Sequence, residues 1–128
     1  MQTLQIILLV GCGGAAGAVF RYFAEFGSVR VLGPGFPFGT LFVNVVGSLL
    51  VGVLAVLLLE KMTNPRVEAA LLTGLLGGFT TFSAFSLETA TLVQQDRLMA
   101  ASSYVIASVG LSLAMVFLGV WLARSWAA

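Results

Sequence analysis

The sequence predicts an all-α integral membrane protein with four transmembrane helices, and two observations support that prediction. Of the 128 residues, 59% are hydrophobic and only 9% are charged, with a mean hydropathy of +1.08. Soluble domains carry about 25% charged residues, so these values exclude a soluble globular protein. Since a membrane helix needs about 20 apolar residues, we expect a single membrane domain of four spans joined by short loops.

The charged and metal-binding residue types exclude several function classes. The chain has six Lys and Arg residues, five Asp and Glu residues, one Cys and no His. Nucleic-acid binding needs clustered basic residues, which this balance does not provide. The usual ligand sets for zinc, haem and iron–sulfur clusters are missing as well. With no His and no Asp in any predicted span, we expect that the protein is not an enzyme.

The first predicted span covers residues 4–23 and is rich in small residues. Gly13 and Gly17 are separated by four positions, a spacing that lets helix backbones approach closely. Arg21 and Tyr22 follow as interface anchors. The long first loop, residues 27–39, contains glycine and proline breakers, and its phenylalanines Phe36 and Phe38 are typical of interfacial rings.

The second predicted span covers residues 40–59 and carries a polar stripe. Its members recur at four-residue steps, which places them on one helical face: Thr40, Asn44, Ser48 and Gly52. An Asn amide in the middle of a membrane span is costly unless it has a partner, so Asn44 is a functional hypothesis by default.

The third predicted span covers residues 67–93, with Asn64 as N-cap and Pro65 as the first helical residue. Its middle holds Gly77-Gly78 followed by four hydroxyl residues, which are Thr80, Thr81, Ser83 and Ser86. Two adjacent glycines weaken a helix, so we expect the third helix to be broken at Gly77-Gly78. Broken helices at membrane depth line polar cavities, which predicts a small-ion pathway here. Glu88 could belong to that pathway or pair with Arg97.

The fourth predicted span covers residues 98–122 and ends in a belt of tryptophan and arginine. Tyr104, Ser108 and Ser112 recur at four-residue steps and would form a hydroxyl track. Spacing alone leaves two interpretations open. The hydroxyls could form a functional track, or each could bond only to the carbonyl four residues earlier in its own helix, as is common in membrane helices. Phe82 and Phe85 in the third span are, by residue type and spacing, more typical of a packed core than of a ligand site.

The polar side chains of the spans favour a small anion as the transported species. Hydroxyls and the Asn amide are hydrogen-bond donors, and the edge of a phenylalanine ring is positive. A lysine in mid-span would hold a small anion too tightly for fast passage, and none is found there. Carbonyls freed at a helix break would instead suit Na⁺.

The distribution of basic residues predicts insertion in both orientations. Lys and Arg residues decide orientation in the membrane, and here they divide evenly between the two sides. One side would hold Lys61, Arg66 and Arg124, and the other Arg21, Arg30 and Arg97. Copies in opposite orientations can pair, so we expect an antiparallel, dual-topology homodimer.

Three motifs resemble those of the Fluc (CrcB) fluoride channels of bacterial membranes, and the resemblance covers essentially the whole chain. The motifs are Gly13-Gly14-xx-Gly17-Ala18-xx-Arg21-Tyr22, Phe38-Gly39-Thr40-Leu41-x-Val43-Asn44-xx-Gly47, and Gly77-Gly78-x-Thr80-Thr81-Phe82-Ser83-x-Phe85-Ser86-x-Glu88. Two positions depart from the family pattern. Ala84 stands where the family more often has Thr, and Tyr22 where Trp is common.

The resemblance implies a multi-pass protein of the bacterial inner membrane that exports F⁻ passively and lowers cytoplasmic fluoride. It further implies a structural Na⁺ at the dimer interface, held by Gly77 and Thr80. The implied ion pathway consists of Asn44, Thr81, Phe82, Ser83, Phe85, Tyr104, Ser108 and Ser112. Possible supporting residues are Arg21, Thr40, Ser48 and Glu88.

Two other classes of protein fit the sequence less well than a channel. Proton-coupled small multidrug or guanidinium exporters are also four-span, dual-topology dimers, but they need a carboxylate in the middle of the first span. Here the first acidic residue is Glu25, at the end of that span. A structural subunit would not need aligned polar stripes in three spans.

Overall fold

The computed structural model describes residues 1–128 and is entirely helical. Its elements are α1 (Gln2–Leu32), α2 (Phe38–Ala55), η1 (Val56–Met62), α3 (Pro65–Glu68), η2 (Ala69–Leu76), α4 (Gly77–Phe79), α5 (Phe82–Gln94) and α6 (Leu98–Ala127), with η1 and η2 in the wider π-helical form. Four stretches are long and apolar enough to cross a membrane: Gln2–Leu32, Phe38–Met62, Pro65–Gln94 and Leu98–Ala127. The predicted all-α membrane fold with four spans is therefore confirmed. The helices extend past the predicted spans because helical hydrogen bonding continues beyond the apolar stretch.

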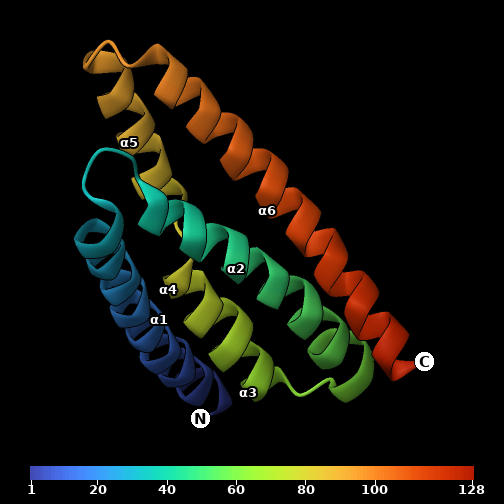
Figure 1. The fold of residues 1–128 in the computed structure, drawn as a ribbon. Helices are drawn as coiled ribbons and strands as arrows, with labels where there is room; N and C mark the ends of the chain where they lie inside the picture. Colours follow the sequence, from blue (N-terminus) through green and yellow to red (C-terminus); the bar gives the residue numbers. More distant parts are fainter.

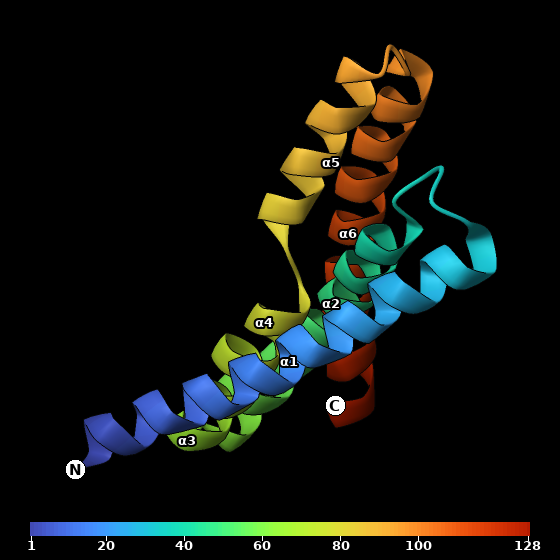
Figure 2. The same cartoon turned by 90° about the vertical axis from the view of Figure 1, so that its left-hand side faces the viewer.

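The four spans form two pairs, as Figure 1 shows. α2 and α6 lie side by side, while α1 packs along the first part of the third span, made of α3, η2 and α4. The last part of the third span, α5, leans away from α1 and packs on α6 (Figure 2). The third span therefore contacts α1 before its interruption and α6 after it.

Glycines make the contact between α1 and the third span. A Cβ atom added to Gly13 would collide with the carbonyl oxygen of Ala70, and one added to Gly17 would collide with that of Leu75. From the other side, a Cβ on Gly78 would collide with the carbonyl oxygen of Gly14. The close packing predicted from the small-residue spacing of the first span is confirmed. α2 and α6 meet in the same way, through Gly52 on α2 and Gly119 on α6.

The predicted position of the helix break, Gly77-Gly78, is wrong. Both glycines are helical, and the interruption lies at Thr80 and Thr81. These two residues have extended backbone, with φ −85° and ψ 153° at Thr80 and φ −150° and ψ 122° at Thr81. The missing side chain of Gly78 lets the third span contact Gly14 on α1, whereas a Cβ atom on Gly77 would meet only an ordinary contact. Gly78 thus serves packing, and the break follows it.

The turn before the third span has the predicted cap. The side chain of Asn64 accepts a hydrogen bond from the Arg66 N–H at 3.1 Å, with Pro65 as the first helical residue. At the same end of the molecule, Arg124 of α6 donates to Glu60 of η1 at 2.8 Å. These polar contacts lie outside the middle of the spans.

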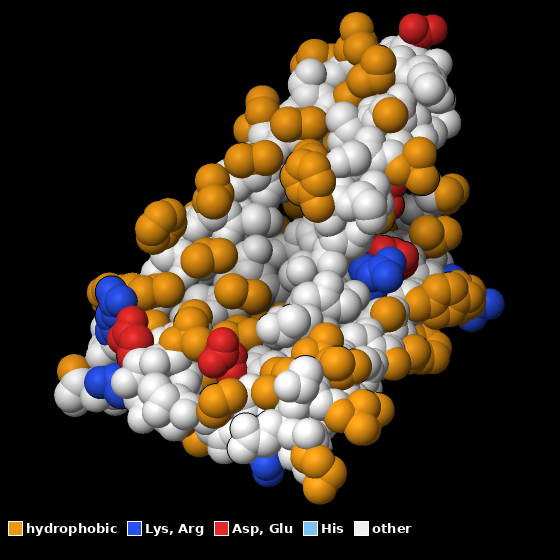
Figure 3. Space-filling model, turned by 180° about the vertical axis from the view of Figure 1, so that it is seen from behind, with side chains coloured by type: hydrophobic (Ala, Val, Ile, Leu, Met, Phe, Trp, Pro, Cys, Tyr) orange, Lys and Arg blue, Asp and Glu red, His pale blue; other side chains and the backbone are white.

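Most of the side chains of this single chain are not buried. Only 17 of 128 residues are buried, and many large apolar side chains face outward. Figure 3 shows hydrophobic side chains spread over one face from end to end, with charged groups in a few places. Such a surface suits lipid or another copy of the chain rather than water.

Candidate functional site

The site is built around the interruption of the third span, where one side chain of α2 replaces the lost helical hydrogen bonds. The Asn44 Oδ1 atom accepts from the Thr81 N–H at 2.7 Å, and the Asn44 Nδ2 atom donates to the Thr81 carbonyl at 2.9 Å. Backbone groups in lipid must be satisfied internally, so this pair of bonds permits extended backbone at membrane depth. The hydrogen-bond partner that Asn44 needs in mid-span is thus the Thr81 backbone at the interruption.

Three more side chains support the break. Thr81 Oγ1 accepts from the Ala84 N–H at 3.1 Å and so forms the N-cap of α5. Thr80 Oγ1 donates to the Leu76 carbonyl at 2.9 Å. Arg21 of α1 donates through Nε to the Gly78 carbonyl at 3.2 Å, and its Nη1 lies 3.7 Å from Glu25 Oε1. The structure places Arg21 as a support of the break and not in the cavity described below.

The break redirects two amides that a continuous helix would use. In such a helix the Thr81 N–H would bond to the Gly77 carbonyl, and the Ala84 N–H to the Thr80 carbonyl. Instead these amides donate to Asn44 Oδ1 and Thr81 Oγ1. The carbonyls of Gly77 and Thr80 therefore lose the amide donors that a continuous helix would give them.

A cavity of about 360 Å³ lies against the break, between α2, α5 and α6. Its lining joins the polar stripes of three spans with the two phenylalanines, and consists of Asn44, Ser48, Thr80, Thr81, Phe82, Phe85, Ser108, Val109, Ser112 and Leu113. Ser108 Oγ is buried and has no hydrogen-bond partner in the chain. The hydroxyl of Ser108 is therefore a free donor at this cavity. We call this space the central cavity.

The aromatic residues of the third span divide between the cavity and the surface. The rings of Phe82 and Phe85 are 5.4 Å apart, and both line the central cavity. Yet Phe82 is 77% exposed in this chain, so its ring is far from a packed core. Ser83, also predicted for the pathway, is exposed and does not line the central cavity; its hydroxyl lies 3.3 Å from that of Thr81.

Glu88 is held by hydroxyls of two other helices. Thr40 Oγ1 donates to Glu88 Oε1 at 2.7 Å, and the Tyr104 hydroxyl donates to Glu88 Oε2 at 2.6 Å. Both donors are fully buried, and each carboxylate oxygen has one partner. Of the two roles open for Glu88, an ion pair with Arg97 is wrong, because Arg97 donates to the Gly35 carbonyl of the first loop instead.

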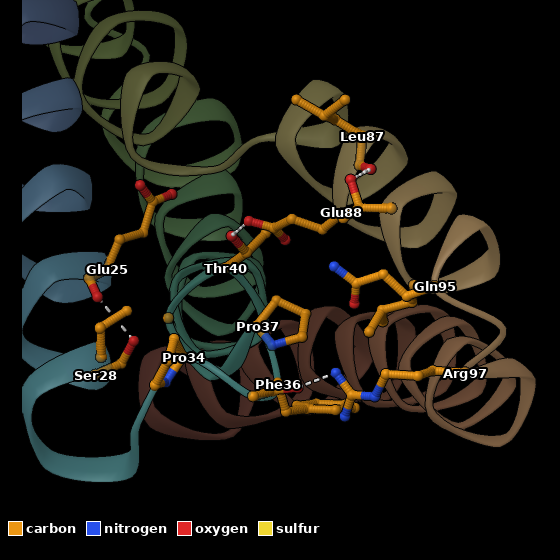
Figure 4. Close-up of a pocket in the computed structure, with 15 residues that line it drawn as sticks. Glu25, Ser28, Pro34, Phe36, Pro37, Thr40, Leu87, Glu88, Gln95 and Arg97 are labelled. Carbon is orange, nitrogen blue, oxygen red and sulfur yellow. Dashed lines mark hydrogen bonds between the residues drawn. The ribbon is translucent and has the colours of Figure 1, made fainter.

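A second cavity, of about 330 Å³, borders Thr40 and Glu88 and is shown in Figure 4. Its lining includes Thr40, Glu88, Glu25, Ser28 and residues of the first loop. We call it the loop cavity.

The cluster of Thr40, Glu88 and Tyr104 adjoins both cavities, and Thr40 and Glu88 line the loop cavity. Tyr104 is one helical turn from Ser108, and its ring is 5.2 Å from Phe85. Polar groups therefore continue along α2 and α6 from the loop cavity into the central cavity.

The first loop contributes more than sequence patterns indicated. Phe36 was interpreted as an interfacial ring, but it packs edge-on against Tyr104 with ring centroids 5.4 Å apart. This contact has no periodic signal, because it joins a loop to a residue near the start of α6. Two neighbouring prolines, Pro34 and Pro37, are the only hint that the loop is rigid.

The fold and the site define a multi-pass membrane protein of the transport class: an interrupted helix borders a cavity lined by hydroxyl and amide groups, with no cationic side chain in its lining. The family model described as "CrcB-like protein, Camphor Resistance (CrcB)" matches residues 8–120. The chain belongs to this CrcB family.

Three relatives are similar over nearly their whole length, and each carries the name "Fluoride-specific ion channel FluC". The relative from Rhizobium meliloti is 50% identical over 120 residues, which are 93% of this chain and 96% of the relative. The relative from Cereibacter sphaeroides is 52% identical over 125 residues, 98% of this chain and 99% of the relative. The relative from Rhizobium etli is 52% identical over 120 residues, 92% and 95% of the two chains.

Proposed function

We propose that this protein is a fluoride-selective ion channel that lets F⁻ leave the cell passively across the inner membrane and so keeps cytoplasmic fluoride low. The observation that carries the proposal is the free, buried hydroxyl of Ser108 in a cavity with no cationic side chain in its lining. The relatives, named fluoride-specific channels, support it at about 50% identity over more than nine-tenths of the chain. Such a protein moves an ion and makes or breaks no covalent bond, so it is not an enzyme.

The lining explains how a strongly hydrated anion could pass. The hydroxyls of Ser108 and Ser112 and the hydroxyl of Thr81 offer O–H donors that replace water around F⁻. The positive ring edges of Phe82 and Phe85 add favourable contacts without hydrogen bonding. Because no fixed cation binds the ion, the affinity for F⁻ at each position along the path is low enough for rapid release. Ser83 would join this path from the exposed side of α5.

We propose in addition that two copies pair as an antiparallel homodimer in the bilayer. A single chain buries only 17 residues and leaves Phe82 77% exposed, as expected of a surface that another copy covers. A two-fold axis presents the same surface of each copy to the other, so the exposed side of α5 would face its counterpart. The even distribution of basic residues supports insertion in both orientations.

The homodimer would also complete a structural Na⁺ site. The carbonyls of Gly77 and Thr80 would hold the ion, since both have lost the amides that a continuous helix would give them. Carbonyls of unwound backbone are the oxygen ligands that Na⁺ takes in membrane proteins. A bound Na⁺ would supply fixed positive charge at the dimer interface, and the second copy would double the number of carbonyl ligands.

The decisive experiment measures anion release from liposomes loaded with K⁺ salts, with valinomycin present and F⁻ and Cl⁻ electrodes outside. We expect rapid F⁻ release and no Cl⁻ release above that of protein-free liposomes. Release of both ions would contradict the selectivity. Release that requires a proton gradient would favour the exporter class, although the first acidic residue of α1 is Glu25, paired with Arg21 near the end of that helix.

Replacement of Glu88 with leucine is expected to slow F⁻ release strongly. The substitution leaves the buried hydroxyls of Thr40 and Tyr104 without an acceptor, and each buried unsatisfied donor costs about 1–3 kcal/mol. The same liposome assay measures the rate, and thermal unfolding in detergent measures stability. Thr89→Val is the matched control on α5, because the Thr89 hydroxyl donates to the Phe85 carbonyl of its own helix and the residue lines neither cavity. Equal rates in the two variants would remove Glu88 from the pathway.

A further inference from the structure

The first loop places one aromatic ring against Tyr104, which contacts Glu88 of the loop cavity and Phe85 of the central cavity. Phe36 and Tyr104 meet edge-to-face, with an interplanar angle of 82° and ring centroids 5.4 Å apart. On another side the Tyr104 ring contacts Phe85, at 5.2 Å. Phe36 also packs on the small buried cluster that contains Leu92 and Ala101. Two phenylalanines, one from the loop and one from α5, therefore restrain the orientation of the Tyr104 ring.

The loop itself is tied to the turn between α5 and α6. Arg97, the last residue before α6, donates through Nη1 to the carbonyl of Gly35. Gly33 ends α1 with φ 82°, a left-handed conformation that favours glycine, and so sets the direction in which the loop leaves. Figure 4 shows Arg97 reaching across the loop cavity toward the loop from the opposite side. The Arg97 bond thus lies one residue away from Phe36.

We propose that Arg97 and Phe36 are positioning residues for ion passage. Arg97 holds the loop, the loop holds Phe36 on Tyr104, and Phe36 keeps the Tyr104 hydroxyl on Glu88. Without that restraint Glu88 would lose one of its two donors, and its less screened negative charge would repel an approaching anion. This inference rests on the proposed channel function and identifies what controls the passage between its two cavities.

The alternative role for Arg97 is simple electrostatic attraction of anions, and the two roles predict different mutant behaviour. Arg97 is exposed and lines the loop cavity, so its charge could raise the local anion concentration. A positioning residue acts through Phe36, so removing both side chains should be no worse than removing Phe36 alone. An attracting charge acts independently of Phe36, so the effects would multiply and would fade at high ionic strength.

The test is a double-mutant cycle of Phe36→Ala and Arg97→Gln in the liposome assay. An aromatic pair of this kind is worth enough to change a rate by about two- to tenfold, and we expect a decrease in F⁻ release of that size. The double variant should release F⁻ at the rate of Phe36→Ala, and Phe36→Tyr should restore most of the wild-type rate. Arg30→Gln is the control, since it removes a basic residue of the first helix that lies over the Phe26 ring and does not line the loop cavity. Multiplying effects that vanish at high salt would overturn the proposal.

A second readout does not depend on transport. With Tyr22 replaced by Phe and 3-fluorotyrosine incorporated, Tyr104 is the only labelled residue, and its ¹⁹F NMR signal reports its surroundings. We expect the signal to shift or broaden in Phe36→Ala and in Arg97→Gln, and to stay unchanged in Arg30→Gln. An unchanged signal in the first two variants would overturn the positioning role. If the wild type released no F⁻, the channel function would fail, while the NMR result would still decide whether Arg97 and Phe36 position Tyr104.

Discussion

Replacement of Asn44 with alanine is expected to abolish F⁻ release almost completely. The Asn44 amide is the partner of both the N–H and the carbonyl of Thr81, at 2.7 and 2.9 Å. Each buried backbone group left unpaired costs about 1–3 kcal/mol, and lipid offers no water as a substitute. Since about 1.4 kcal/mol corresponds to a factor of ten, we expect release to fall at least roughly 30-fold. The liposome assay with an F⁻ electrode measures this fall.

Two companion variants sharpen the interpretation of Asn44. Asn44→Asp keeps an acceptor for the Thr81 N–H but has no donor for the Thr81 carbonyl, so it should also fail and places a negative charge in the central cavity. Ser102→Ala changes an exposed hydroxyl of α6 and should release F⁻ like the wild type. A full rate in Asn44→Ala would show that the break does not need this side chain and would contradict the site described above.

Gly17→Ala and Gly78→Ala are expected to prevent correct folding. A Cβ on Gly17 would strike the Leu75 carbonyl and would lie 2.8 Å from the Phe79 nitrogen, while one on Gly78 would strike the Gly14 backbone. Overpacking against side chains costs about 1–3 kcal/mol, and backbone cannot yield by changing rotamer, so we expect about 3 kcal/mol or more. Size-exclusion chromatography in detergent would show a loss of monodisperse protein, and any remaining protein should unfold at a lower temperature.

Two glycines with open surroundings provide the control for this prediction. Gly11 of α1 and Gly110 of α6 have open space around an added Cβ, and alanine there should leave the elution and the unfolding temperature unchanged. Alanine also has the higher helix propensity of the two residues. If Gly17→Ala behaved like Gly11→Ala, the packing of α1 on the third span would be wrong.

The sequence by itself determined the membrane class, the four spans and the residue types at the site. These properties are local or periodic: the length of apolar runs, the four-residue spacing of Gly13 and Gly17, and the stripe through Asn44. The structure brings Asn44 and Ser48 of that stripe together with Ser108 and Ser112 of α6 in one cavity, while Thr40 and Tyr104 meet at Glu88. These features can be predicted from the sequence because the spacing of residues along a helix decides which helical face each one occupies.

The position of the break could be decided only by tertiary structure. Propensity favoured Gly77-Gly78, but both glycines are helical, and Gly78 serves the close packing of the third span on Gly14. Extended backbone is instead stabilised at Thr81, because Asn44, 37 residues earlier in the chain, supplies both replacement hydrogen bonds. A helix in lipid breaks where its backbone finds other partners, and those partners lie on another helix.

The partners of Glu88 and the role of the first loop were likewise decided only in three dimensions. Thr40, Glu88 and Tyr104 stand on three different helices, and no spacing within one helix predicts that they meet. Phe36 lies in a loop without periodicity, and Arg97 reaches its carbonyl partner across 62 positions of sequence. Local patterns predict which face a residue occupies, whereas the packing of the helices decides which faces come into contact.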